Sequence, residues 1–409
     1  MDYNLMHTSL FKSLHLTSLA AIVLIASGCS GVVSHQYIKT NSNGAITEIK
    51  KNYQQFGDEY QVIAEINGPI TLSSDALTIT SMSKGSFVKI KHFKSDDFLM
   101  ISEKNGEVTY GDQKGNTPNK NEIEQFMTSV FDNTPLFAVE RTKALIEQQG
   151  ISAALNQMER ANNDDTKSAY ITAVSANNLD LPAQKRVLAV LAQIKSDYSQ
   201  RVTAERFLDK QKQLPDQAWL TFLRGLNGMS SDYETRVLLS KLAPQLPNTQ
   251  TIHQAYFDVS KTIDSDYEKF RLISEIPAQS THLSIADMFT ASADIGSDYE
   301  AYRVVNALAS EVKTPNDFEA MLTFMQQIDS DYEMKRAFLS LPYQTMDRAT
   351  TAQSIELASK FIDSDYELSK TLIHICQKSP YKAQLTETVK LALQSIGSDS
   401  DRVKVYDVL

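Results

Sequence analysis

Residues that carry chemistry are scarce in this sequence. Its 409 residues include two cysteines, one tryptophan and seven histidines. No two histidines stand at the spacing of a metal or catalytic pair, and Gly-rich phosphate loops and the Gly-x-Ser-x-Gly and His-Glu-x-x-His patterns are absent. We therefore expect no catalytic residue, no cofactor and no metal site, and an enzyme is the least favoured interpretation.

Basic segments are missing as well. The formal net charge is −10, no block of lysine or arginine occurs, and the apolar content of 42% is ordinary for a soluble protein. Because a nucleic-acid-binding chain needs a basic patch to neutralise phosphates, we expect no nucleic-acid partner.

One apolar run exists, from Leu16 to Cys29, and it is shorter than the roughly 20 residues of a membrane span. Lys12 precedes it, and small residues stand just before Cys29, as in a leader peptide. The stretch Ala26-Ser27-Gly28-Cys29 resembles the lipobox of bacterial lipoproteins, with alanine where leucine is more usual. The resemblance implies that residues 1–28 are a signal peptide and that Cys29 becomes the lipidated mature N-terminus.

Alternatives to this interpretation are an ordinary signal peptide and an uncleaved anchor, and Met6 rather than Met1 could be the start. In the resembling lipoproteins an aspartate after the cysteine opposes sorting to the outer membrane. Ser30 in that place favours a lipid anchor on the periplasmic side of the outer membrane. A lipidated Cys29 leaves no partner for a disulfide, so Cys376 is expected as a small buried apolar residue.

A short phrase returns seven times in the second half of the chain. It reads SDYS at Ser196, SDYE at five positions and SDSD at Ser398, and the steps between its serines are 35, 34, 32, 33, 34 and 34 residues. This period is typical of a two-helix unit that stacks on copies of itself. A degenerate copy, Asn163-Asp164-Asp165-Thr166, lies 33 residues before Ser196. The phrase therefore predicts an α-solenoid of HEAT-like helix pairs.

Ser-x-x-Glu in the phrase predicts a capping box. The serine oxygen would accept from the backbone N–H three residues on, and the glutamate would accept from the serine N–H. Five copies have both members: Ser231 and Glu234, Ser265 and Glu268, Ser297 and Glu300, Ser330 and Glu333, Ser364 and Glu367.

Apolar residues recur at fixed places around each phrase. They stand seven, eight and eleven residues after the serine, as in Val304, Val305 and Leu308, which is one face of a helix. Two residues before each serine stands an isoleucine or Met229, which should close the preceding helix inside the core.

The aspartates and tyrosines of the phrase allow two interpretations each. Helix capping explains the aspartates, whereas an acidic ridge for a basic partner is the alternative, formed by Asp232, Asp266, Asp298, Asp331 and Asp365. Calcium binding is disfavoured because the EF-hand glycine and distal glutamate are missing. Packing between repeats explains the tyrosines, and an exposed aromatic strip for a partner is the alternative. The basic residue five or six positions after each serine is expected to pair with a first-turn carboxylate.

Period-two runs occupy the region before the helices. EYQVIAEINGPITLS places Val62, Ala64 and Ile66 on one face and has Asn67-Gly68 as a turn. Further short runs follow, separated by turn residues that include Asn105-Gly106. They predict an antiparallel meander of six or seven strands. The predicted domains are a signal peptide (1–28), a tether (29–44), an antiparallel β domain (45–112), a linker and helix (113–133) and the α-solenoid (134–409).

The quoted β segment, the helical stretch ERTKALIEQQGISAALNQMERANNDD and the SDYE repeats together resemble a group of bacterial envelope lipoproteins. These join an adhesin-like β segment to HEAT-like repeats, and similar repeats stand beside membrane metallopeptidases of the antibiotic-sensor type. The resemblance spans most of residues 45–409. It implies architecture and implies no activity.

A stacked helical array offers a long surface, which favours a periplasm-facing scaffold or accessory sensor that binds another envelope protein. The alternative is a structural, adhesin-like protein that acts through its β domain. In both cases the membrane is reached through the lipid anchor alone.

Replacing Cys29 by serine is predicted to release the protein from membranes or leave it unprocessed, because the acyl chains on that residue hold it there. Membrane flotation and mass spectrometry of the mature N-terminus check this. An unmodified N-terminus at another residue would contradict the lipobox assignment.

Overall fold

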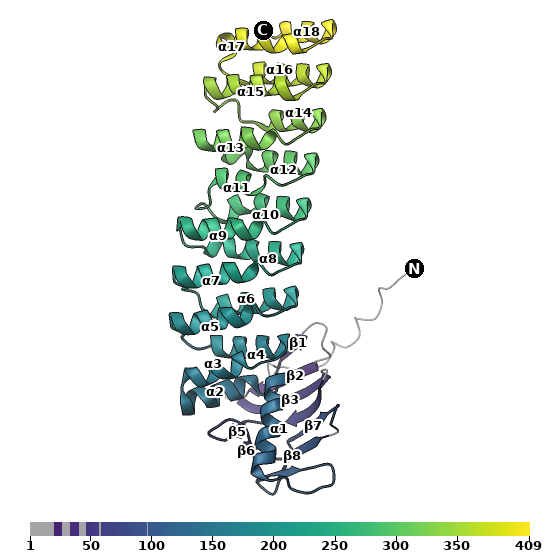
Figure 1. The fold of residues 1–409 in the computed structure, drawn as a ribbon, viewed down its shortest axis with the longest axis vertical. Coiled ribbons are helices and arrows are strands. Elements are labelled where there is room, and N and C mark those ends of the chain that lie inside the picture. The colour runs from purple at the N-terminus through teal and green to yellow at the C-terminus, as the bar shows by residue number, and fades with distance from the viewer. Residues whose placement is uncertain (1–19, 27–32, 41–45, 57–58, 96) are drawn as a thin grey trace, which may run out of the picture. The chain divides into compact units, whose positions relative to one another are not determined.

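The computed structural model describes residues 20–26, 33–40, 46–56, 59–95 and 97–409, with side chains from Glu59 onward. Cys29, the rest of the lipobox after Ala26 and both candidate start residues lie outside the described residues, so the leader assignment stays a prediction. The chain divides into two compact units, Met1–Lys212 and Gln213–Leu409. An antiparallel sheet is followed by a chain of helix pairs, as the repeats predicted (Figure 1).

The first unit begins with antiparallel strands. The described strands are β1 (Ala20–Ala26), β2 (Val33–Thr40), β3 (Ile46–Phe56), β4 (Tyr60–Ile66), β5 (Ile70–Leu72), β6 (Ile79–Met82), β7 (Phe87–His92), β8 (Phe98–Lys104) and β9 (Glu107–Gly111). They form a seven-stranded sheet in the order β1-β2-β3-β4-β7-β8-β9 and a separate pair, β5-β6. The segment expected as a tether therefore includes strand β2, whose backbone pairs with β3.

The predicted meander is interrupted by the β5-β6 hairpin, since β4 pairs with β7 and not with its successor. Asn67-Gly68, expected as a hairpin turn, instead leads the chain away from the sheet. Gly68 is needed there for close approach, because a Cβ atom would come within 2.2 Å of the Ser83 hydroxyl. The other predicted turn is confirmed: Asn105 and Gly106 both have positive φ, at 54° and 88°, between β8 and β9.

A tyrosine fastens the hairpin to the sheet. The Tyr110 hydroxyl on β9 accepts from the Ile79 N–H at 2.6 Å and donates to the Ile79 carbonyl at 2.9 Å. Burial raises the pKa of Tyr110 to about 12. The hydroxyl thus stays protonated and keeps both bonds at any physiological pH.

The core of this unit lies between the sheet and the helix α1 (Lys120–Asn133). Alternate residues of β4, including Val62, Ala64 and Ile66, are buried as predicted. Met127, Val130 and Phe131 of α1 belong to the same cluster, so the helix expected in a linker covers the sheet. Asn119 and Glu122 make a complete capping box at its start.

Five more helices complete the first unit: α2 (Ala138–Gln149), α3 (Ile151–Glu159), α4 (Asp164–Ser175), α5 (Leu181–Leu191) and α6 (Asp197–Lys210). Thr134 as N-cap, Pro135 at the first helical position and Gly150 after the last turn predict a helix between them. The predicted start is wrong. Leu136 and Phe137 are drawn into the sheet core, Phe137 has a φ of 55°, and the helix begins only after it. The predicted end is confirmed, because Gly150 terminates α2 with a φ of 85°.

Arg141 of α2 joins the sheet domain to the first helix pairs. Its guanidinium lies 3.7 Å from the Phe131 ring centroid and donates to the Ala76 carbonyl at 2.9 Å and the Tyr170 hydroxyl at 2.6 Å. Burial lowers the pKa of Arg141. Because these partners come from the β5-β6 connection, α1 and α4, a single buried side chain fixes several elements.

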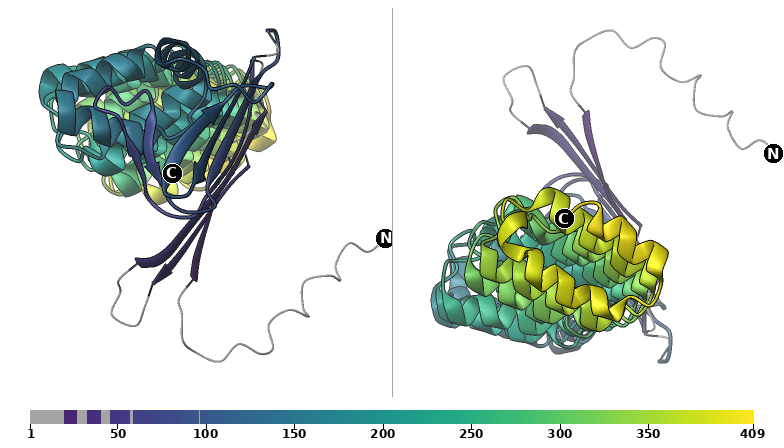
Figure 2. Two further views of the ribbon diagram at one scale, coloured as in Figure 1. Left: turned by 90° about the horizontal axis from the view of Figure 1, so that it is seen from below. Right: turned by 90° about the horizontal axis from the view of Figure 1, so that it is seen from above.

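The second unit consists of helices in two layers. They are α7 (Asp216–Leu226), α8 (Asp232–Leu242), α9 (Gln250–Ser260), α10 (Asp266–Gln279), α11 (Ile285–Ala291), α12 (Asp298–Leu308), α13 (Pro315–Met325), α14 (Asp331–Ser340), α15 (Arg348–Phe361), α16 (Asp365–Lys378), α17 (Lys382–Ala392) and α18 (Asp399–Tyr406). Even-numbered helices, which begin in the phrase and are called helix A below, pack on one another. Odd-numbered helices, called helix B, form the second layer (Figures 1 and 2).

The predicted core positions of this unit are confirmed. The residues seven, eight and eleven after the five SDYE serines are buried, and so are the residues two before them, such as Ile263, Ile295 and Ile328. After Ser398, in the last copy, Val405 is buried and Tyr406 is exposed. The phrase serine caps each helix A. In one example the Ser330 hydroxyl accepts from the Glu333 N–H at 3.4 Å.

The aspartates of the five SDYE phrases bind the backbone of the next phrase. Asp298 of α12 accepts from the N–H groups of Asp329 at 3.0 Å and Ser330 at 2.9 Å, one on each carboxylate oxygen. The same pair of bonds recurs down the second unit, from Asp232, Asp266, Asp331 and Asp365 to the following phrase. In the first unit the degenerate phrase does the same through Asp164, which accepts from Lys195 and Ser196. We call this arrangement the aspartate ladder.

The glutamate half of the capping box is therefore wrong. The serine N–H groups of Ser265, Ser297, Ser330 and Ser364 are taken by the aspartate ladder. The glutamates three residues on pair with cations instead. Glu268 accepts from Arg236 of the preceding repeat at 2.5 Å, and Glu333 accepts from Arg336 of its own repeat at 2.9 Å. Only the serine side chain makes the cap that the sequence predicted.

Replacing Asp298 by alanine is predicted to lower the free energy of unfolding by about 1–3 kcal/mol, because two backbone N–H groups lose a charged acceptor. Ser330→Ala should cost about 1 kcal/mol, as for other N-caps, and Leu308→Ala about 2–5 kcal/mol through a cavity. Urea unfolding of the variants measures these differences.

Asp329→Ala is the matched control. Its exposed side chain makes no contact that the ladder uses, since only its N–H is bound. We expect a change within about 0.5 kcal/mol. Equal losses for Asp298→Ala and Asp329→Ala would contradict the aspartate ladder.

Candidate functional site

The phrase tyrosines are exposed. Tyr233, Tyr267, Tyr299, Tyr332 and Tyr366 of the second unit are each between 46% and 54% accessible to solvent. The prediction that they pack in the core between repeats is therefore wrong, and the alternative of an exposed aromatic strip describes them. We call these five residues the tyrosine strip.

The helical period places the strip outside the core. Each tyrosine lies in the first turn of a helix A, whereas the buried residues stand four, seven, eight and eleven positions after the serine. The residue four positions beyond the tyrosine, such as Arg303 or Arg336, shares its face. Tyrosine and arginine consequently line the outer side of the helix A layer together.

Arginines link neighbouring rings of the strip. The Arg303 guanidinium lies 5.9 Å from the Tyr267 centroid and 5.4 Å from that of Tyr299. Arg336 in turn lies 5.7 Å from Tyr299 and 5.6 Å from Tyr332. The strip thus alternates ring and cation over Tyr267, Tyr299 and Tyr332, with contacts in the range of cation–π attraction.

The cations of the strip stand further out than their carboxylate partners. The Arg303 side chain is 29% exposed against 12% for Glu300, and Arg336 is 31% exposed against 14% for Glu333. The predicted pairing with first-turn carboxylates is confirmed for both. Arg271 departs from it and pairs with Glu275 at 2.8 Å. Its hydrogen bonds to Glu275 and Tyr267 raise the pKa of the Arg271 guanidinium, so the charge is permanent.

The proposed acidic ridge is occupied by backbone. Both oxygens of Asp266, Asp298 and Asp331 accept N–H groups of the following phrase. This supports the structural interpretation of these aspartates over a ridge for a basic partner. The ladder uses only the N–H of the residue before the serine, so that residue can be aspartate, glycine or lysine.

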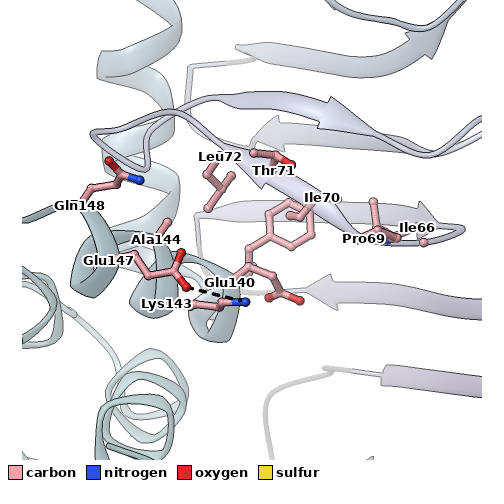
Figure 3. Close-up of a pocket in the computed structure, with 12 residues that line it drawn as sticks. Ile66, Pro69, Ile70, Thr71, Leu72, Glu140, Lys143, Ala144, Glu147 and Gln148 are labelled. Carbon is pink, nitrogen blue, oxygen red and sulfur yellow. Dashed lines mark ion pairs between the residues drawn. The ribbon is translucent and has the colours of Figure 1, made fainter. Parts of the chain in front are cut away.

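A groove in the first unit is a second candidate. It has a volume of about 400 Å³ and lies between strand β5 and helix α2 (Figure 3). Pro69, Ile70 and Leu72 line one side, and Lys143 and Glu147, which are paired at 3.8 Å, line the other. An apolar wall with a few charged side chains opposite it is the composition of many ligand-binding sites.

Chemically reactive groups do not converge within the part of the chain that the structure describes. No three histidine, cysteine, aspartate or glutamate side chains in that part are placed to hold a metal ion. Cys376 is buried as predicted, at 5% exposure, and burial raises the pKa of its thiol. Among the described helices, none is long and apolar enough to cross a membrane.

Comparisons with models of protein families, with curated proteins and with solved structures found no match. The resemblance to envelope lipoproteins with SDYE-type repeats therefore stays a prediction.

Replacing Tyr299 and Tyr332 together by alanine is predicted to cost little stability, about 1–2 kcal/mol for both, because the lost contacts are half-exposed cation–π contacts and one ring contact with Tyr302. Thermal and urea unfolding measure the change. A loss as large as that expected for Leu308→Ala would show that the strip serves the fold.

Proposed function

We propose that this protein is a non-enzymatic, periplasm-facing lipoprotein that acts as a protein–protein interaction scaffold or accessory sensor of the cell envelope. The observation that carries the proposal is the tyrosine strip. A residue repeated in register down five helices, half exposed and unnecessary for the core, has its most direct use in contact with a partner. Tyrosine and arginine are also the side chains most enriched in the energetic centres of interfaces.

The anchor belongs to the same proposal. Lipid on Cys29 would hold the protein at the membrane. In the resembling proteins a residue other than aspartate after the lipidated cysteine favours the outer membrane, and Ser30 is such a residue. The partner would then be another envelope protein. Its identity follows from experiment and not from the fold.

A photo-crosslinking residue placed at Tyr299 or Tyr332 of the full chain, in the bacterium that encodes it, tests the proposal. We expect a discrete adduct with an envelope protein from both positions. Gln254 and Glu319 are matched controls, because they are exposed on helix B of the same unit. No adduct, or the same adducts from strip and control positions, would contradict the proposal.

A second candidate function is a structural, adhesin-like role through the β domain, which the groove between β5 and α2 favours. Deleting the sheet would not test it cleanly, because Phe137 at the start of α2 shares the sheet core. The crosslinker at Gln148, an exposed groove residue, separates the two. Adducts from Gln148 alone would favour the β domain.

A further inference from the structure

The spacing of the tyrosine strip selects the shape of a ligand. Arg303 touches two successive rings, so the Tyr267 and Tyr299 centroids cannot be further apart than its two contact distances of 5.9 and 5.4 Å together. Packed helices stand about 8–10 Å apart, which sets the rise from one tyrosine to the next. A ligand that lies along the strip must therefore repeat one face at nearly this interval.

Among regular polypeptide conformations, one has this period in a single turn. An α-helix returns to the same face about every 5.4 Å, so that two turns overshoot the interval at about 10.8 Å, and a β-strand returns about every 6.7 Å. Polyproline II makes a turn of three residues with a rise of about 3.1 Å each, or about 9 Å per turn. One turn of polyproline II thus matches one repeat of the solenoid.

The chemistry of the strip fits the same conformation. Polyproline II has no internal hydrogen bonds, so its carbonyl groups need donors, and its proline rings pack on aromatic faces. The strip offers tyrosine rings and hydroxyls. It also offers guanidinium N–H groups: within the described residues, both hydrogen bonds of Arg303 leave from Nη1.

Charge adds a further requirement. The arginines of the strip stand outside their glutamate partners, so the strip presents cations to a ligand. Carboxylates between the prolines would meet them at the positions that face Arg303 and Arg336. A basic proline-rich segment would meet like charge and is disfavoured.

We propose that the tyrosine strip binds a proline-rich, acidic segment of a partner protein in the polyproline II conformation, one turn per repeat. The inference rests on the proposed function, since it assigns the partner of the same surface. It goes beyond that function in naming the conformation, the composition and the register of what is bound.

Calorimetric titration of the full chain carrying Cys29→Ser tests it. The probes are synthetic peptides of three, six, nine and twelve residues that repeat Pro-Pro-Glu, so that each turn carries one carboxylate between its prolines. We expect affinity to rise with each added turn and to level off when the strip is covered. A glycine-serine peptide of the same length and charge should bind at least about tenfold more weakly. It loses conformational entropy when it becomes ordered on binding, whereas the proline peptide is already restricted to the bound conformation.

Two variants fix the location. Tyr299→Ala with Tyr332→Ala should weaken binding of the twelve-residue Pro-Pro-Glu peptide about tenfold or more, as expected for aromatic residues at the centre of an interface. Leu391→Ala removes an apolar side chain that is 65% exposed on α17, away from the strip, and should change nothing.

Binding that does not grow with proline number, or that survives the double tyrosine variant, would overturn the inference. So would preferential binding of an oligosaccharide to the strip. If crosslinks from Tyr299 persist in cells while no proline peptide binds, the inference fails and the proposed function stands. If the crosslinks are absent as well, both fail.

Discussion

The repeats depend on one interaction, the acceptance of two backbone N–H groups by a first-turn aspartate of the preceding helix A. The carboxylate lies at a helix N-terminus, where the dipole favours negative charge, and it satisfies the N–H of the next N-cap, which no helical carbonyl can reach. In a solenoid each repeat is stabilised by its contacts with the neighbouring repeats. A bond between successive phrases therefore strengthens the interfaces that make the repeats fold cooperatively. The aspartate ladder links one copy of the phrase to the next in register.

This constraint leaves the rest of the phrase free. The residue before the serine contributes only its N–H to the ladder. Both aspartate and glycine therefore occur there, as Asp264, Gly296, Asp329, Asp363 and Gly397. The tyrosine is directed outward by the helical period and contributes nothing to the core. A structural device and a binding surface can therefore share four consecutive residues without conflict.

The sequence predicted what depends on local period and missed what depends on distant partners. Repeat length, serine caps and buried positions such as Ile328 and Leu308 follow from spacing along one chain segment, and the structure has them. The Ser330 N–H found its acceptor in Asp298, 32 residues away, which a local capping pattern does not reveal. The exposure of the tyrosines was missed for a related reason. Aromatic residues that recur in register suggest packing between repeats. Only the position of the tyrosine around the helix axis, on the side away from the buried residues, shows that it is exposed. The β5-β6 hairpin was missed because the same Asn-Gly pair can form a hairpin turn or can let the backbone pass close to another segment. At Asn67-Gly68 the structure has the second arrangement.

Amide hydrogen exchange resolved to single residues tests the central claim most directly. If the aspartate ladder holds the repeats together, Asp298→Ala will accelerate exchange at the N–H groups of Asp329 and Ser330, whereas Glu333→Gln will leave them protected. If a capping box held the serine N–H instead, Glu333→Gln would expose Ser330 and Asp298→Ala would not, and that result would contradict the account.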